Sequence, residues 1–168
     1  MRLAAFGLRM ALALGATSAE SPMTEGYAYS RETMPGIPEG PGVSASSGRS
    51  LETAWFIYVV VRDGTLPTEA SVWLKGKHYS ATLRKVASPV LVEHDPVLPS
   101  GKKDTLVPAT SAPVYQVLPA EEQSRSPAND AEKQLTQDNE VVVFLRAERT
   151  TYRVPIKAVK PLRPAPGR

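Results

Sequence analysis

Alternation of apolar and polar residues over residues 151–158 predicts a β-strand within 151–160. One set of positions holds Tyr, Val, Ile and Ala, and the other set holds Thr, Arg, Pro and Lys. A two-residue period indicates a strand with one face in the core and the other in solvent. Pro155 has no N–H to donate, so we expect this strand at the edge of a sheet.

The uninterrupted apolar run 54–61 predicts a second strand, covered on both faces. It contains only Ala, Trp, Phe, Ile, Tyr and Val. Aromatic and β-branched residues favour strands, and a run without alternation indicates that neither face is in water. Further strands are predicted at 90–92, 105–107, 114–118 and 140–148.

Residues 119–138 form the single stretch with helical character. Helix-forming residues occupy 131–137, but Leu135 is the one large apolar side chain among them. One such residue cannot form a wide face against a core, so we expect a loop with about two helical turns.

A β-hairpin is predicted around Gly76 and Lys77. Glycine at the first central position favours a two-residue type II′ turn, because that position needs a positive φ. This turn places Leu74 opposite Tyr79 and leaves Trp73 on the other face. The apolar residues of both strands then share one face, so turn chemistry and hydrophobic pattern agree.

Roughly six to eight short strands separated by turn residues, with no alternating helices, predict an all-β fold. We expect a small antiparallel β-sandwich or barrel over residues 51–160. Gly, Pro, Ser, Thr and Glu dominate residues 20–50, which we expect to be a disordered linker. The proline-rich residues 161–168 are expected to be a disordered tail.

Residues 1–19 have the composition of an export signal. They contain two arginines, no acid, an apolar middle and a Thr-Ser-Ala close, so we expect a secreted or periplasmic protein. Arg9 interrupts the apolar run, which leaves a mitochondrial presequence open, as well as a true start at Met10, Met23 or Met34. No stretch reaches the ~20 apolar residues that a membrane-spanning helix needs.

The charge balance changes when the predicted signal is removed. The 168-residue chain carries +3, with 20 Lys and Arg against 17 Asp and Glu, and the part after residue 19 carries +1. Residues 20–52 carry −3 and residues 53–168 carry +4. A domain of this charge attracts anions weakly and does not by itself indicate nucleic acid, whose readers cluster basic residues on one face.

No constellation of residues favours catalysis. Cysteine is absent, which excludes thiol nucleophiles, disulfides and cysteine-ligated metals. His78 and His94, even with Asp95 or Asp104, match no compact metal motif. No serine lies in a Gly-x-Ser-x-Gly elbow. We therefore predict no catalytic residue, metal or cofactor, although a hydrolase with an unrecognised carboxylate pair stays open.

The sequence favours a non-enzymatic binding or adaptor domain whose partner is another protein or a surface polymer. Contacts are expected from the hairpin, from the loop 94–104 or from an open sheet edge such as 151–160, because exposed edges accept a partner's strand. The alternative is a basic nucleic-acid-binding barrel of the oligonucleotide-binding type, or an organellar adaptor, with hairpin aromatics stacked on bases. The candidate binding residues are Trp73, Lys75, Lys77, His78, Tyr79 and His94.

Overall fold

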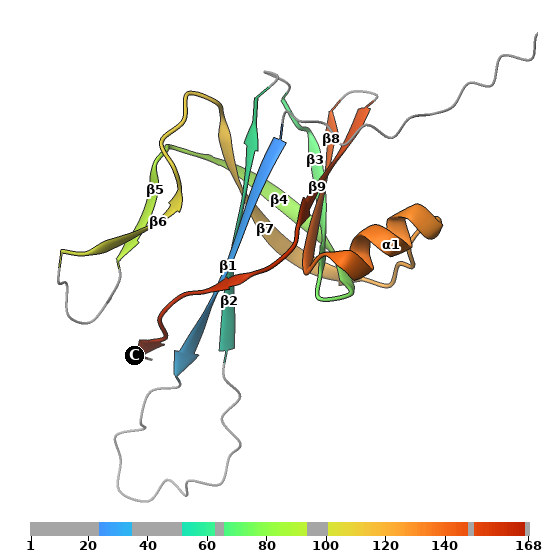
Figure 1. Ribbon diagram of the computed structural model, residues 1–168. Helices are drawn as coiled ribbons and strands as arrows, with labels where there is room; N and C mark the ends of the chain where they lie inside the picture. Colours follow the sequence, from blue (N-terminus) through green and yellow to red (C-terminus); the bar gives the residue numbers. More distant parts are fainter. Residues whose placement is uncertain (1–23, 35–51, 63–65, 94–100, 148–149, 167–168) are drawn as a thin grey trace, which may run out of the picture.

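The computed structural model describes residues 24–34, 52–62, 66–93, 101–147 and 150–166, which form a curled sheet, a smaller sheet and one helix (Figure 1). The large sheet has the strand order β10-β1-β2-β7-β4-β3-β8-β9, with β11 also paired to β1, and β5 and β6 form the small sheet. All pairings except those of β10 and β11 are antiparallel. The predicted antiparallel all-β fold is confirmed. The elements are β1 (Thr24–Met34), β2 (Glu52–Val61), β3 (Glu69–Leu74), β4 (Lys77–Val86), β5 (Val90–Glu93), β6 (Lys103–Val107), β7 (Val114–Gln123), α1 (Asp130–Asp138), β8 (Val141–Ala147), β9 (Thr150–Ile156), β10 (Lys160–Pro161) and β11 (Ala165–Pro166).

The large sheet curls until β1 and β9 lie side by side. Gly26 on β1 makes this approach possible, because a Cβ atom there would lie 2.6 Å from Cγ1 of Ile156 and 2.9 Å from Cγ1 of Val154. Among the described residues no backbone ladder joins these two strands. Side-chain packing therefore closes the barrel along this seam.

Aliphatic side chains fill the inside of the curled sheet. Branched aliphatic residues suit this position because they pack well on a pleated surface, and burying each contributes roughly 1.5–3 kcal/mol. The most deeply buried members of this core are Ile57, Val59, Val72, Val117, Val141, Val143 and Leu145.

The β5–β6 sheet covers the outer face of β1 and β2. Tyr58 and Val60 of β2 point outward and pack with Leu106 and Val107 of β6, while the alternate residues of β2 point into the barrel. The apolar run 54–61 is therefore covered on both faces over most of its length, as its lack of alternation predicted.

Helix α1 covers the outer face of β3 and β8. Leu135 packs against Trp73, Val142 and Phe144, three side chains that point away from the barrel. The nine-residue helix agrees with the short helix predicted between 119 and 138, but residues 119–123, expected in a loop, extend β7 instead. A single leucine suffices because the sheet supplies the rest of the apolar contact.

Two segments expected to be disordered contribute strands to the sheet. Residues 24–34, predicted as part of the linker, form β1 and pair with β2. Residues 160–166, predicted mainly as tail, contribute β10 and β11, which pair in parallel with β1. These contacts stabilise both segments, although their composition alone favours disorder. The predicted signal 1–19 lies outside the described residues.

Within the described part of the chain, strand β9 has one hydrogen-bonded neighbour, β8, so Pro155 lies on an edge strand as predicted. The open edge expected at 151–160 is confirmed in part, because no strand among the described residues pairs with the outer edge of β9, although other segments lie close to it or pair with the end of this stretch. The beginning of β1 packs beside β9, and Lys160 and Pro161 pair with Tyr29 and Ser30 of β1.

Candidate binding site

The hairpin predicted around Gly76 is formed by β3 and β4, with its turn one residue earlier than expected. Lys75 and Gly76 have φ angles of 49° and 79°, and two positive φ angles define a type I′ turn. Val72 pairs with Tyr79, a shift of two residues from the predicted register. A shift of two preserves the faces of a strand, so Trp73 still points away from Val72 and the core.

The aromatic residues of this hairpin are part of the protein's packing. Trp73 and His78 have exposed fractions of 5% and 3%, and their ring centroids lie 5.2 Å apart on the outer face. Tyr79 is on the other face and packs against the interior core. These three residues therefore do not form one exposed aromatic surface.

The two lysines of the predicted binding set are exposed, but each has an intramolecular contact. Nζ of Lys75 lies 4.9 Å from the centroid of the Trp55 ring, and Nζ of Lys77 lies 2.9 Å from Oε2 of Glu122. His94 lies outside the described residues. The structure thus places the five described candidates in different environments.

A buried carboxylate organises the segment that leads into α1. The Glu132 side chain is 4% exposed, and its oxygens accept hydrogen bonds from Nη2 of Arg125 at 3.1 Å and from the backbone N–H of Ala128 at 3.3 Å. Asn129 Oδ1 in turn accepts from the backbone N–H of Glu132 at 2.8 Å, an arrangement similar to a capping box. Nη1 of Arg125 lies 3.4 Å from Nε2 of His78, so the same guanidinium also reaches β4.

His78 is expected to make stability fall in mild acid. Its burial, together with the nearby Arg125 guanidinium, lowers the pKa of His78 below 6.5, against smaller opposing effects of Glu132 and Gln123. Because the unfolded chain then binds the proton more readily, stability is full above the unfolded pKa and decreases as the pH falls below about 6.5. The slope is at most about 1.4 kcal/mol per pH unit, the value for one proton.

Urea unfolding of the wild type and of His78→Phe between about pH 7.5 and pH 5 measures this contribution. Phenylalanine at position 78 keeps an aromatic ring of similar size but has no titratable group. The variant should therefore lose less stability than the wild type between about pH 7.5 and pH 5. Parallel pH profiles for the two proteins would contradict the assignment.

A groove of about 390 Å³ lies between β6 and the C-terminal segment 160–163, on the opposite side of the sheet from α1 (Figure 1). Three consecutive residues of β6, 104–106, and four consecutive residues, 160–163, line this β6 groove, together with Tyr29 of β1. Side chains of successive strand residues point to opposite faces. Residues from both faces of the two segments therefore line the groove.

Strand β6 has an unpaired edge that is held firmly against the barrel. Among the described residues, β6 pairs with β5 alone. A register shift in this pairing accompanies burial of both Leu106 and Val107, at 2% and 0% exposed. The Tyr29 hydroxyl donates to the carbonyl of Leu106 at 2.7 Å, and Nη2 of Arg31 donates to the carbonyl of Glu93 at 3.2 Å.

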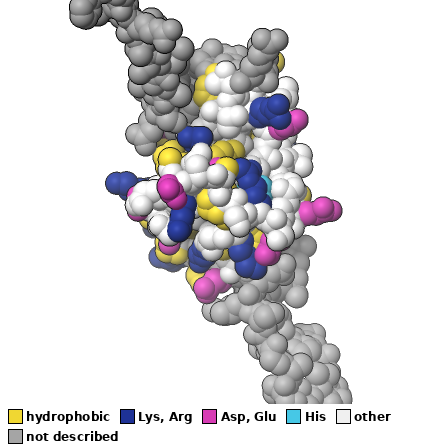
Figure 2. Space-filling view, turned by 90° about the vertical axis from the view of Figure 1, so that its right-hand side faces the viewer, with side chains coloured by type: hydrophobic (Ala, Val, Ile, Leu, Met, Phe, Trp, Pro, Cys, Tyr) yellow, Lys and Arg dark blue, Asp and Glu magenta, His cyan; other side chains and the backbone are white. Residues whose placement is uncertain are grey.

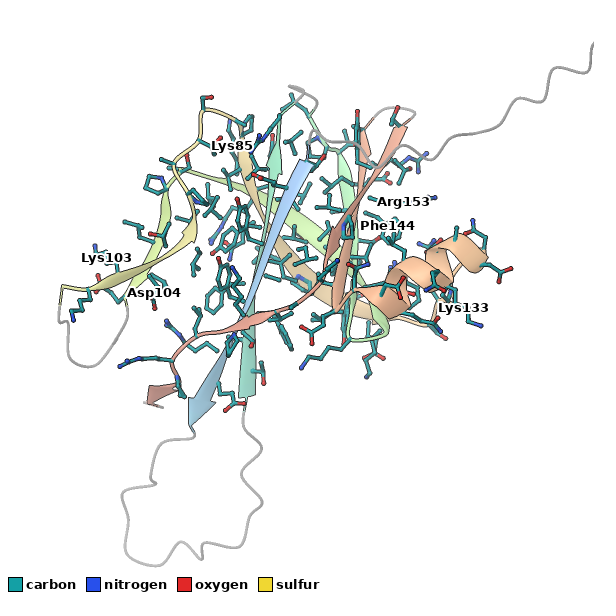
Figure 3. All side chains as sticks on the ribbon, in the orientation of Figure 1. Lys85, Lys103, Asp104, Lys133, Phe144 and Arg153 are labelled. Atoms are coloured by element: carbon teal, nitrogen blue, oxygen red, sulfur yellow. The ribbon has the colours of Figure 1, made fainter. Side chains whose placement is uncertain are left out.

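The C-terminal wall of the β6 groove is basic. Lys160 and Arg163 are exposed, and neither has an ion-pair partner among the described residues. The β6 wall carries Asp104, while Nζ of the neighbouring Lys103 pairs with Oε1 of Glu93 at 3.3 Å. Figure 3 shows Lys103 and Asp104 leaving β6 in different directions. The groove therefore has two cations on one wall and one carboxylate on the other.

Comparisons with protein-family models, curated proteins and solved structures found no match. Within the described ranges, no group of three or more His, Asp or Glu side chains is placed to hold a metal ion. No helix in the described part of the chain has the length and apolar character of a membrane span. The barrel and its grooves are therefore the features from which a function can be inferred.

Proposed function

We propose that this protein is a binding domain, not an enzyme, and that it captures an extended segment of a partner protein in the β6 groove. The observation that carries the proposal is the unpaired edge of β6 along one wall. An added strand gains affinity from main-chain hydrogen bonds and specificity from the side chains that it places against the walls.

The anchoring of β6 supports this function. A two-stranded hairpin alone is marginally stable, but here Leu106 and Val107 are buried against β1 and β2. An edge that is already ordered avoids the entropy cost of being ordered on binding. The five residues of β6 offer the length of a typical strand.

The charges of the groove indicate the chemistry of the partner. Lys160 and Arg163 favour acidic side chains on the side of the incoming strand that faces the C-terminal wall. Paired edges need backbone N–H and C=O groups at strand spacing, which a polypeptide has and a polysaccharide or nucleic acid lacks. An extended, acidic protein segment is therefore the partner that fits.

A blocked peptide of alternating Glu and Val tests the proposal by amide chemical shifts of the full chain. We expect shift changes at residues 103–107 and 160–163. The same peptide with one central N-methyl group that removes a pairing N–H should bind at least about fivefold more weakly, the equivalent of one lost hydrogen bond. The double variant Lys160→Glu, Arg163→Glu should bind about three- to tenfold more weakly than the wild type.

The matched control is Lys133→Glu, which reverses an exposed charge on α1 far from the β6 groove (Figure 3) and should leave the affinity unchanged. Strand addition would be excluded as the mode of binding by shift changes confined to other strands. It would also be excluded if the N-methylated peptide bound as tightly as the unmodified one wherever the methyl group was placed. Failure of the unmodified peptide to shift the amides of β6 would overturn the proposal.

A further inference from the structure

We infer that a second groove, on the α1 side of the sheet, binds a carboxylate attached to an apolar body. This arginine groove has a volume of about 280 Å³, and Arg125, Arg146, Phe144 and Glu69 line it together with small side chains of β3 and Thr151. It lies on the outer face of β3, β8 and β9, so it shares no residue with the β6 groove. The inference does not depend on the proposed function.

Basic side chains surround the apolar part of this groove. Arg125 and Arg146 line it, and Arg153 is the cross-strand partner of Phe144, which places both on one face (Figure 3). Figure 2, which looks onto this side of the molecule, shows Lys and Arg side chains mixed with Asp and Glu side chains and with hydrophobic atoms among them. An anion that enters the groove therefore meets positive charge from more than one strand.

Arg125 is held in position by a carboxylate that is hidden from the groove. Nη2 of Arg125 pairs with Oε1 of Glu132 at 3.1 Å, yet the Arg125 side chain is 41% exposed and that of Glu132 only 4%. Nη1 of Arg125 also lies 3.4 Å from Nε2 of His78, so a ligand would bind the remaining N–H groups of this partly exposed guanidinium. Because a guanidinium can bind two carboxylates through different N–H groups, this arrangement suits the binding of a second one.

The second arginine of the groove has a partner that a ligand can replace. Arg146 Nη1 lies 3.4 Å from Oε2 of Glu69, and both side chains are more than 60% exposed. Exposed ion pairs of this kind contribute little to stability, so an incoming carboxylate can take the place of Glu69. Glu69 is then a competitor for the site, and its removal should strengthen binding.

The rest of the surface is apolar or small. Phe144 is 9% exposed and lines the groove with both arginines, and Ser71 of β3 is its cross-strand partner. Ligand sites combine such apolar surface with a few polar groups that fix orientation. A small acid with a flat apolar body satisfies both parts, whereas a bare inorganic anion uses only the guanidinium groups.

Titration of the full chain with 2-naphthoate, followed by amide chemical shifts, tests this site. We expect shift changes at Arg125, Phe144 and Arg146, and markedly weaker binding of naphthalene-2-carboxamide and of inorganic phosphate. Arg146→Gln should weaken naphthoate binding about tenfold, and Glu69→Gln should strengthen it about threefold. An increase for Glu69→Gln cannot result from damage to the fold.

Lys133→Gln on α1 is the charge-matched control and should leave naphthoate affinity unchanged. The double variant Lys160→Glu, Arg163→Glu should also bind naphthoate normally, which separates this site from the β6 groove. Equal binding of the carboxamide, equal binding of phosphate, or weaker binding by Glu69→Gln would each overturn the inference. So would shift changes that do not include the arginine groove.

Discussion

Replacing Trp73 with alanine is expected to lower the free energy of unfolding by about 3–5 kcal/mol, the usual cost of removing a buried tryptophan. Trp73 is 5% exposed and packs with Val142, Phe144 and Leu135. Leu135 is the α1 residue in this cluster, so the cavity also removes much of the helix's apolar contact. Urea unfolding followed by far-ultraviolet circular dichroism measures the loss.

Two variants serve as controls for Trp73→Ala. Trp73→Phe should cost clearly less, because Nε1 of Trp73 has no hydrogen-bond partner among the described residues and the change loses volume alone. Lys75→Ala, at an exposed position of the same hairpin, should cost no more than about 1 kcal/mol, the upper value for its exposed contact with the Trp55 ring. A Trp73→Ala protein as stable as the wild type would show that Trp73 is not part of the packing. Trp73 would then again be a candidate for ligand binding.

Gly26→Val is expected to destabilise the protein by about 1–3 kcal/mol or more, because it forces extra carbon atoms into a packed contact. Even the first of these atoms would lie 2.6 Å from Cγ1 and 2.8 Å from Cδ1 of Ile156. The barrel has to open along the seam between β1 and β9, or Ile156 has to move. Urea unfolding gives the stability change, and amide exchange in β1 and β9 shows whether the seam has loosened.

A double-mutant cycle separates this clash from any general effect at position 26. Ile156→Ala removes both atoms that a Cβ would meet most closely, so Gly26→Ala should cost less in that background than in the wild type. We expect a coupling energy of about 0.5–3 kcal/mol, as for other residues in direct contact. Additive effects of the two changes would show that β9 does not pack on β1 as described.

Local patterns were sufficient to predict most strands and their faces, because each depends on residues close together in the chain. The hairpin shows the limit of such reasoning. Glycine fits one central position of type II′ turns and both central positions of type I′ turns, so Gly76 is compatible with either. In the structure the type I′ register forms, and it pairs Trp73 with His78 and Val72 with Tyr79.

Strand β1 was missed because its inward face is made of small residues. Gly26, Ala28 and Ser30 point toward the barrel where β9 approaches, and Ala28 alone of these belongs to the buried core. Small residues are needed for that close approach, but they give almost no hydrophobic period. Its outward tyrosines are covered by β6, which lies more than seventy residues further along the chain.

The grooves combine segments that no local pattern connects. The β6 groove needs β1, β6 and residues 160–163, and the arginine groove needs four separate segments. One signal was present in the sequence, since Asn129 and Glu132 have the spacing of a capping box. It locates the start of α1, but it does not reveal that Glu132 binds Arg125.

The pairing of β1 with residues 160–166 has a consequence for protein synthesis. One edge of β1 can pair with β2 early, but the other edge is covered by β9, β10 and β11, which are translated after the other described strands. A nascent chain that stops before residue 150 therefore carries a strand with an unprotected edge, the feature through which chains join one another in aggregates. Truncated products that lack β9, β10 and β11 should precipitate far more readily than the chain that contains these three strands.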